Sequence, residues 1–316
     1  MESSAAGWRL AKRFVAGTTL PEVVAAVRAA NAAGLAATID QLGENVVSAE
    51  LARATAQSYH AVLDAIQANR LDANVSIKLT HLGLDLPPQR AKTGRVGDPI
   101  DGSLCGQLTG SLVEHATRNG SFIRVDMEGS AYTQRTLDLV RALHRSGAPT
   151  PASRDQACWE SHGKGAVGTV IQSCLRRSRA DAALLCSEGI RIRLVKGAYR
   201  EPREIAFPRK AEVDDNFLEL ARKLLSSGLY HAIATHDERL IAEIIAFARQ
   251  ENMAREAFEF QMLYGVRREL QQRLAAQGWR VRIYIPFGTE WYPYFMRRLA
   301  ERPANVWFLL KNLVRE

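Results

Sequence analysis

The amino-acid sequence predicts an α/β protein that folds as one (βα)8 barrel over residues 1–316. Eight short apolar segments have the composition of β-strands, and stretches with helical periodicity separate most of them. No repeat or low-complexity linker marks a second domain. Alternating β and α segments imply a parallel sheet, and eight such units fit a closed barrel. A doubly wound open sheet is the alternative, but it would normally offer fewer strands.

The expected elements follow one another along the whole chain. An N-terminal helical segment covers residues 1–34, where Thr18, Thr19 and Pro21 signal a helix start. The strands are expected at 35–40, 75–80, 122–128, 168–173, 190–196, 232–236, 258–263 and 281–285. The clearest helical patterns cover 48–69, 133–145, 214–226, 238–251 and 267–277. Two stretches rich in Gly and Pro, 87–111 and 144–166, are expected to be long surface loops or partly disordered segments.

Composition narrows the class of partner. The net charge of +8 and the pI of about 9.5 favour an acidic metabolite, a phosphate-bearing cofactor or an anionic membrane surface. The basic residues are dispersed among acidic ones without a nucleic-acid-binding motif, so no nucleic acid is expected. The four cysteines form no C-x-x-C and the start lacks a secretory pattern, which predicts a cytoplasmic protein. The seven histidines lack metal-ligand spacing, so no metal site is expected.

Polar residues close all eight expected strands. They are Asp40 with Glu44, Lys78, Asp126, Gln172, Arg193 with Lys196, Thr235 to Asp237, Gln261 and Tyr284. Each alone could be packed inside a barrel or paired structurally, but together they favour one site at the strand ends. Lys78 could bind a carboxylate or form a Schiff base, and Asp126 could act as a base or orient a cation. Gly197, between Lys196 and Ala198, would let a ligand approach exposed backbone N–H groups.

A final helix over the barrel mouth is expected to open at Pro293. Tyr294, Arg297, Arg298 and Glu301 then fall at i, i+3, i+4 and i+7, on one face. Adjacent arginines can grip a carboxylate or phosphate in a forked geometry. A solvated, salt-bridged helix is the alternative. The position directly after a strand favours a binding site.

Several motifs, in this order, resemble the proline dehydrogenase family, the catalytic domain of proline utilisation flavoproteins. They include Ser-Ile-Lys-Leu-Thr-His-Leu-Gly (76–83), Ile-Arg-Val-Asp-Met-Glu-Gly (123–129), Arg-Leu-Val-Lys-Gly-Ala-Tyr (193–199), Phe-Glu-Phe-Gln-Met-Leu-Tyr-Gly (258–265) and Tyr-Pro-Tyr-Phe-Met-Arg-Arg-Leu (292–299). The resemblance runs from about residue 8 to residue 313. It implies a distorted (βα)8 TIM barrel that binds FAD and oxidises L-proline to Δ1-pyrroline-5-carboxylate. It also implies that a membrane quinone accepts the electrons, which adds an expected peripheral contact with an anionic inner membrane.

The resemblance also implies roles for individual residues. The proline carboxylate would be bound by Lys78, Arg297 and Arg298, and the ring would be walled by Tyr284 and Tyr294. The catalytic positions match Asp126 and Arg193, with Arg193 near flavin N5. The FAD contacts match Met127, Val170, Gln172, Arg193, Lys196, Gly197, Ala198, Thr235 and His236. Glu44 matches an acid that pairs with the first arginine of the final helix as a gate.

Other readings stay open at this point. A lyase or aldolase on the same barrel could use Lys78 or Lys196 as a Schiff base, and a flavin enzyme could prefer hydroxyproline or N-methylproline. A non-catalytic binding module fits poorly with polar residues at eight strand ends. Residues 163–168 match G-x-G-x-x-G but precede a strand, whereas the dinucleotide fingerprint follows one. The oligomeric state is left open.

Overall fold

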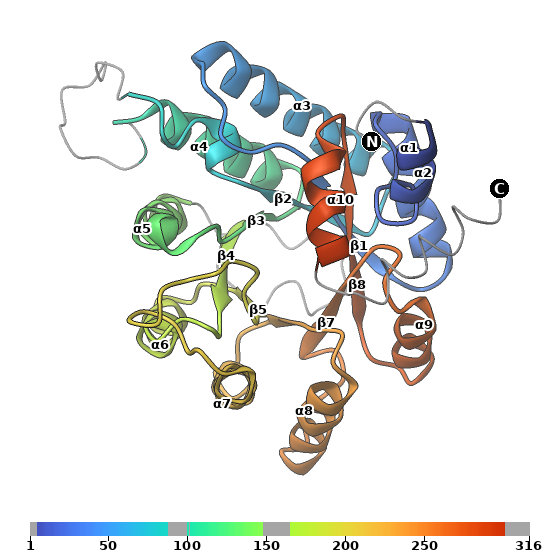
Figure 1. The fold of residues 1–316 in the computed structure, drawn as a ribbon, viewed down its shortest axis with the longest axis vertical. Helices are drawn as coiled ribbons and strands as arrows, with labels where there is room; N and C mark the ends of the chain where they lie inside the picture. Colours follow the sequence, from blue (N-terminus) through green and yellow to red (C-terminus); the bar gives the residue numbers. More distant parts are fainter. Residues whose placement is uncertain (1–4, 88–99, 101, 148–164, 301–316) are drawn as a thin grey trace.

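The computed structural model describes residues 5–87, 100, 102–147 and 165–300, which form a closed barrel of eight parallel strands (Figure 1). The strands are β1 (Ala36–Gln41), β2 (Ala73–Ile77), β3 (Ile123–Val125), β4 (Val167–Gln172), β5 (Ile192–Val195), β6 (His231–Ala234), β7 (Phe258–Leu263) and β8 (Val281–Phe287). Each pairs with its neighbour in the chain, and β1 pairs with β8 to close the ring. The predicted barrel is confirmed.

Helices surround the strands in the expected alternation. They are α1 (Ala5–Ala11), α2 (Leu20–Ala32), α3 (Ala49–Ala68), α4 (Leu104–Arg118), α5 (Ser130–Ser146), α6 (Ser178–Ser187), α7 (Lys210–Leu225), α8 (Glu238–Gln250), α9 (Arg268–Ala276) and α10 (Trp291–Ala300), with a short 3-10 helix η1 (Thr80–Leu82). The predicted N-terminal helical segment is therefore two helices. Within the described ranges, no helix combines the length and apolar character that a membrane span needs.

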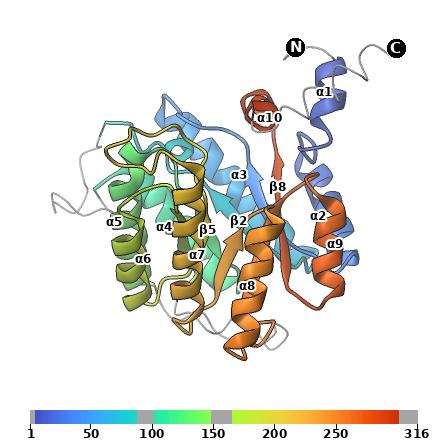
Figure 2. The ribbon, with the colours of Figure 1, turned by 60° about the horizontal axis from the view of Figure 1, so that its bottom comes forward.

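The barrel is distorted at its last unit. A regular barrel would place the helix after β8 in the outer ring, against the sheet. Here α2 takes that place and packs on both β1 and β8. The last helix, α10, lies instead over the rim of the barrel, beside α1 (Figure 2). This arrangement frees α10 to carry side chains toward the mouth, as the sequence predicted.

Two separate apolar clusters hold these layers. The main core lies between strands and outer helices. Helix α8, for example, buries Leu240, Ile244 and Ala248 on one stripe, and each large apolar side chain so buried contributes about 1.5–3 kcal/mol. The smaller cluster joins α1 to α10, where the Trp8 and Trp291 rings lie 5.2 Å apart between centroids. The second cluster fixes α10 above the mouth.

The loop predicted at 87–111 is wrong over its last part, because α4 begins at Leu104. The Ser103 side chain caps this helix by accepting a hydrogen bond from the Gly106 N–H at 2.9 Å. Gly106 and Gly110 lie inside α4, and each glycine in a helix costs about 1 kcal/mol relative to alanine. Burial of apolar residues such as Leu104 outweighs that cost. Residues 88–99 and 101 lie outside the described residues.

Element ends also differ from the prediction at other points. The loop predicted at 144–166 is wrong at its start, because α5 continues to Ser146, and residues 148–164 lie outside the described residues. Strand β2 ends at Ile77 and β3 at Val125, so Lys78 and Asp126 follow their strands directly. Short strands place these two side chains at the barrel mouth.

Candidate active site

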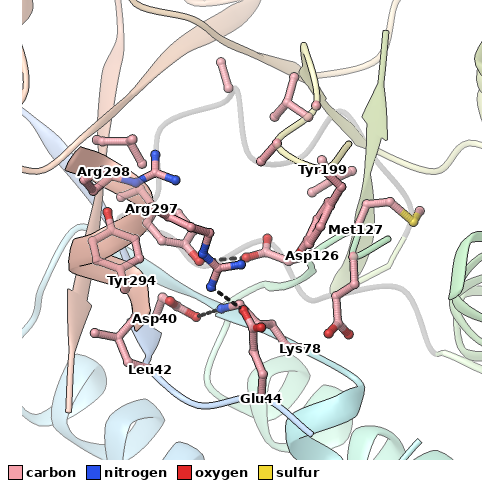
Figure 3. Close-up of a pocket in the computed structure, with 18 of the residues that line it drawn as sticks. Asp40, Leu42, Glu44, Lys78, Asp126, Met127, Tyr199, Tyr294, Arg297 and Arg298 are labelled. Carbon is pink, nitrogen blue, oxygen red and sulfur yellow. Dashed lines mark hydrogen bonds and ion pairs between the residues drawn. The ribbon is translucent and has the colours of Figure 1, made fainter. Parts of the chain in front are cut away.

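A cavity of about 1170 Å³ opens at the C-terminal ends of the strands (Figure 3). Residues from all eight strands, or from the loops that follow them, line this cavity together with residues of α10. The structure brings together every residue that the sequence assigned to a site: Glu44, Lys78, Asp126, Met127, Val170, Gln172, Arg193, Lys196, Gly197, Ala198, Thr235, His236, Tyr284, Tyr294, Arg297 and Arg298. Their individual roles stay predictions.

The centre of the cavity is an Asp126–Arg193 pair. Arg193 Nη1 lies 2.6 Å from Asp126 Oδ1, and Arg193 Nε donates to Gln261 Oε1 at 2.5 Å. The Tyr284 hydroxyl donates to the other oxygen, Asp126 Oδ2, at 2.7 Å. Burial, and then the nearby Asp126 carboxylate, raise the pKa of Tyr284, so its phenol stays protonated. Asp126 therefore anchors Arg193 and Tyr284, with hydrogen bonds to both of its oxygens.

A second pair, Lys78 and Asp40, lies beside the first. Lys78 Nζ is 2.8 Å from Asp40 Oδ1, and the Asp40 carboxyl is fully buried. Burial raises the pKa of Asp40 to about 6, against the opposing effect of Lys78. Burial alone would lower the pKa of Lys78, but Asp40 and Asp126 outweigh it and raise that pKa. Lys78 is thus held as a cation, whereas a Schiff-base nucleophile needs a neutral amine.

Helix α10 brings two guanidiniums to the mouth from one side (Figure 3). Arg297 Nη2 lies 2.7 Å from Oε1 of Glu44, which is in the loop between β1 and α3. Burial lowers the pKa of Arg297, but the bond to Glu44 outweighs it and the pKa is raised. The Arg298 guanidinium stacks over the Tyr294 ring, 5.1 Å from its centroid.

The structure departs from the prediction at the start of α10. The helix begins at Trp291 and not at Pro293 as predicted, and proline is tolerated in a first helical turn. Glu301, which the spacing placed on the same face as the arginines, lies outside the described residues.

The loop after β5 forms the opposite wall. Gly197 has a φ of +116°, and a Cβ at this position would lie 2.4 Å from Cys174 Sγ, so the conformation and the space both require glycine. Lys196 Nζ lies 2.6 Å from Asp214 Oδ1 and 3.1 Å from Asp237 Oδ2. Glycine thus lets this wall pack closely on Cys174, and both Gly197 and the fixed Lys196 cation line the cavity.

The polar side chains around this wall are held by hydrogen bonds, two of them to residues at other strand ends and one within the same loop. Gln172 Nε2 donates to the Glu128 carbonyl at 3.1 Å, and His236 Nε2 accepts from the Leu263 N–H at 2.9 Å. Thr235 Oγ1 accepts from the Asp237 N–H at 3.1 Å. Each of these residues thus has a defined orientation before any ligand binds.

Sequence reasoning missed some residues of the cavity. Tyr199 lines it directly after the Lys196–Ala198 loop, and this adjacency was the signal that could have found it. His81 lines it from η1, where burial lowers its pKa to about 4 and keeps the imidazole neutral. Among the residues that the structure describes, no group of three or more His, Cys, Asp or Glu side chains is arranged for a metal ion.

Fold and site together define a class. A closed (βα)8 barrel whose charged and aromatic residues converge at the C-terminal ends of its strands is a TIM-barrel enzyme. The family model described as "Proline dehydrogenase" matches residues 23–311. Proline dehydrogenase of Deinococcus radiodurans is 38% identical over 310 residues, which cover 98% of this chain and 91% of that protein. The chain belongs to the proline dehydrogenase family, whose members are oxidoreductases.

Further relatives agree with this assignment. Proline dehydrogenase 1 of Bacillus subtilis is 37% identical over 99% of this chain and 94% of its own length. Among solved structures, proline utilization A from Bdellovibrio bacteriovorus, inactivated by N-propargylglycine, superposes with a TM-score of 0.78 at 26% identity. That match covers 92% of this chain and 32% of the larger one, so this chain spans about a third of that protein.

Proposed function

We propose that this chain oxidises L-proline to Δ1-pyrroline-5-carboxylate with bound FAD and passes the electrons to a quinone. The observation that carries the proposal is the convergence of Lys78, Arg297 and Arg298 with two tyrosines on one cavity. Several cations facing a small apolar wall suit a zwitterion with one carboxylate and a saturated ring. The family relationship supports the same substrate.

The cations would hold the carboxylate and orient the ring. Charge-assisted hydrogen bonds from Arg297, Arg298 and Lys78 fix the substrate at one end. Tyr284, neutral and bonded to Asp126, offers its ring face as a wall. The Arg297–Glu44 contact joins two residues of the cavity lining that come from α10 and from the loop after β1, and we propose that it opens when substrate enters and closes behind it.

The residues of the opposite wall fit FAD. The volume of about 1170 Å³ exceeds the range of roughly 300–1,000 Å³ that is usual for one small ligand, which leaves room for a dinucleotide beside proline. Gly197 and Ala198 would receive the cofactor against their backbone, and Lys196 would face its diphosphate. Met127, Val170, Gln172, Thr235 and His236 would line the remainder of the cofactor. When bound, the flavin supplies the hydride acceptor.

Arg193 would act on charge. Its guanidinium is buried and fixed by Asp126 and Gln261, so it presents a preorganised positive charge to the cavity. Such a fixed positive charge would stabilise the negative charge that the electron acceptor, and not the substrate, gains in the oxidation. The net charge of +8 would favour contact with an anionic membrane, where a quinone could be reached from the cytoplasm.

The raised pKa of Lys78 argues against the Schiff-base alternative, whereas hydroxyproline and N-methylproline share the carboxylate grip and remain candidates. The test is an anaerobic flavin spectrum of the purified protein. We expect a yellow protein that L-proline bleaches faster than trans-4-hydroxy-L-proline or N-methylproline. A protein that takes up no FAD and reduces no dye with proline would reject the proposal. Borohydride trapping of a substrate adduct at Lys78, read by mass spectrometry, would favour the lyase.

A further inference from the structure

We propose that Glu201 is a positioning residue for the substrate cavity. It ties the loop that presents Tyr199 to the loop that carries Asp126. The inference rests on the proposed function, since it concerns how the same cavity is held in shape.

The tie consists of two hydrogen bonds to the first residue of α5. Glu201 Oε1 accepts from the Ser130 backbone N–H at 2.8 Å, and Oε2 accepts from the Ser130 hydroxyl at 2.5 Å. The N-cap residue of α5 is Gly129, which has no side chain to cap the helix, and the first turn contains no acidic residue. Glu201 therefore supplies from a distant loop both the acceptor and the negative charge that a helix N-terminus favours.

The loop between β5 and α7 is fixed on its other side by backbone bonds to the loop after β4. The Cys174 N–H donates to the Lys196 carbonyl at 2.9 Å, and the Phe207 N–H donates to the Cys174 carbonyl at 2.8 Å. The Arg176 N–H donates to the Ile205 carbonyl at 2.9 Å. These bonds hold the two ends of the loop. Glu201 holds its middle, next to Tyr199.

The tie bridges two walls of the cavity. Asp126 and Met127 lead through Gly129 directly into Ser130, so Glu201 reaches past β4 to the segment that follows β3. Tyr199 lies in the cavity on the side of Met127, with Arg298 opposite (Figure 3). One carboxylate thus sets the distance between the Asp126 loop and the Tyr199 loop.

Loss of the tie should affect binding more than chemistry. Tyr199 would then spend part of its time away from the cavity, and the apparent affinity for a ligand that contacts it falls with the fraction of protein in the competent arrangement. Asp126, Arg193 and Tyr284 keep their own mutual bonds. We therefore expect Glu201→Ala to raise the KM for L-proline by about threefold to tenfold while kcat changes less than about twofold.

Three further variants make the test specific. Glu201→Gln keeps an acceptor for the backbone N–H and should raise KM less than Glu201→Ala. As a single variant, Ser130→Ala should raise KM. Combined with Glu201→Ala it should cause no further rise, because the two side chains share one interaction. Glu188→Ala is the matched control. Glu188, at the end of α6, accepts a hydrogen bond from Arg141 of α5 at 2.8 Å, and neither residue lines the cavity. Loss of Glu188 should lower the melting temperature without changing KM.

Flavin content and melting temperature are measured for every variant. An unchanged KM in Glu201→Ala, or an equal rise in Glu188→Ala, would overturn the positioning role. If wild type does not oxidise proline, the proposed function fails separately. The same variants are then compared on the imino acid that wild type does oxidise, where the same KM pattern is expected and its absence counts against Glu201.

Discussion

In the part of the chain that the structure describes, two arginine–carboxylate pairs inside the barrel differ in whether they reach the cavity. Arg193 and Asp126 lie at the mouth and line the cavity, whereas Arg282 and Glu259 do not. Arg282 comes two residues before Tyr284 on β8, and Glu259 two residues before Gln261 on β7, so they point inward one layer deeper. Arg282 Nε lies 2.8 and 2.9 Å from the two Glu259 oxygens. The same kind of ion pair therefore lies in the packed interior in one layer and on the cavity in the next.

The two layers are connected. Gln261 accepts a hydrogen bond from Arg193 Nε and donates from Nε2 to Glu259 Oε1, both at 2.5 Å. The deeper pair thus helps to orient the upper guanidinium. A polar residue inside a barrel is therefore evidence for a site only when its layer reaches the cavity. We therefore expect substitutions in the deeper layer to change stability and substitutions at the cavity to change activity.

The deeper pair should dominate stability. Glu259→Leu leaves the Arg282 guanidinium buried without its carboxylate, which should cost about 3–5 kcal/mol of the free energy of unfolding, measured by urea denaturation. The double variant Glu259→Leu with Arg282→Met should recover much of that loss, because a well-packed apolar pair replaces two buried charges. A double variant no more stable than Glu259→Leu would mean that the pair is not acting as a unit.

Cations at the mouth should instead control activity. Arg298→Met and Arg297→Met each remove a charge-assisted contact of about 1.5–3 kcal/mol, so kcat/KM for L-proline should fall about 10-fold to 150-fold. Flavin content and the free energy of unfolding should change little. Arg222→Met on α7, which loses an exposed contact to Glu243, is the control and should keep wild-type kinetics. Unchanged proline kinetics in both α10 variants would mean that this face of the helix is a solvated surface and not a binding site.

A fall in pH should change the free energy of unfolding in opposite directions through Asp40, beside the cavity, and through Glu259, in the deeper layer. The pKa of Asp40, raised by burial to about 6, means that its contribution to stability is present at low pH and lost as the pH rises through 6. Glu259 behaves in the opposite way. Burial alone would raise the pKa of Glu259, but the Arg282 guanidinium outweighs it and lowers that pKa to about 2. The contribution of Glu259 to stability is therefore lost as the pH falls toward 2.

The difference is measurable near neutrality. Between pH 5 and pH 7 the free energy of unfolding should fall by about 1 kcal/mol more in wild type than in Asp40→Asn. Parallel curves for the two proteins across that range would show that Asp40 does not titrate there.

The smallest expected effect concerns ring specificity. Tyr284→Ser should open space beside the substrate ring, lower proline kcat/KM, and raise the ratio of 4-hydroxyproline to proline turnover by about twofold to tenfold. Tyr230→Ser removes the hydroxyl that donates to Glu259 in the deeper layer, and should lower the melting temperature without changing the ratio. If Tyr284→Ser also lowers only the melting temperature, Tyr284 belongs to packing and not to specificity.

The sequence predicted the barrel well because strand periodicity and polar strand ends are local signals. Asp126 and Lys78 could be placed at the mouth because they lie near the C-terminal ends of the strands expected at 122–128 and 75–80. The depth of Glu259 and Arg282 in the barrel could not be predicted from the sequence. Alternation along a strand shows which face of the sheet a residue lies on, but not which layer opens to a cavity. Helix α4 was missed because Gly106 and Gly110 lower local helix propensity while burial, a tertiary effect, decides the outcome.

Contacts between distant parts of the chain were beyond local reasoning. The Arg297–Glu44 contact joins residues 253 positions apart, and the family resemblance alone suggested it. The Glu201–Ser130 tie had no signal at all in the sequence, since an acid in an irregular loop is usually solvated. Tyr199 did have a signal, its position directly after the predicted Lys196–Ala198 loop, but an aromatic residue beside a loop does not by itself indicate a cavity.

The place of α2 has a consequence for how this enzyme can evolve. Because α2 covers β1 and β8, the core does not depend on α10 to shield the sheet. Substitutions on the polar face of α10 should therefore have little effect on folding, whereas most substitutions in the core destabilise the protein. If the arginines of α10 bind the substrate as proposed, new substrate preferences can arise in this helix while the barrel that supports the redox chemistry is inherited unchanged.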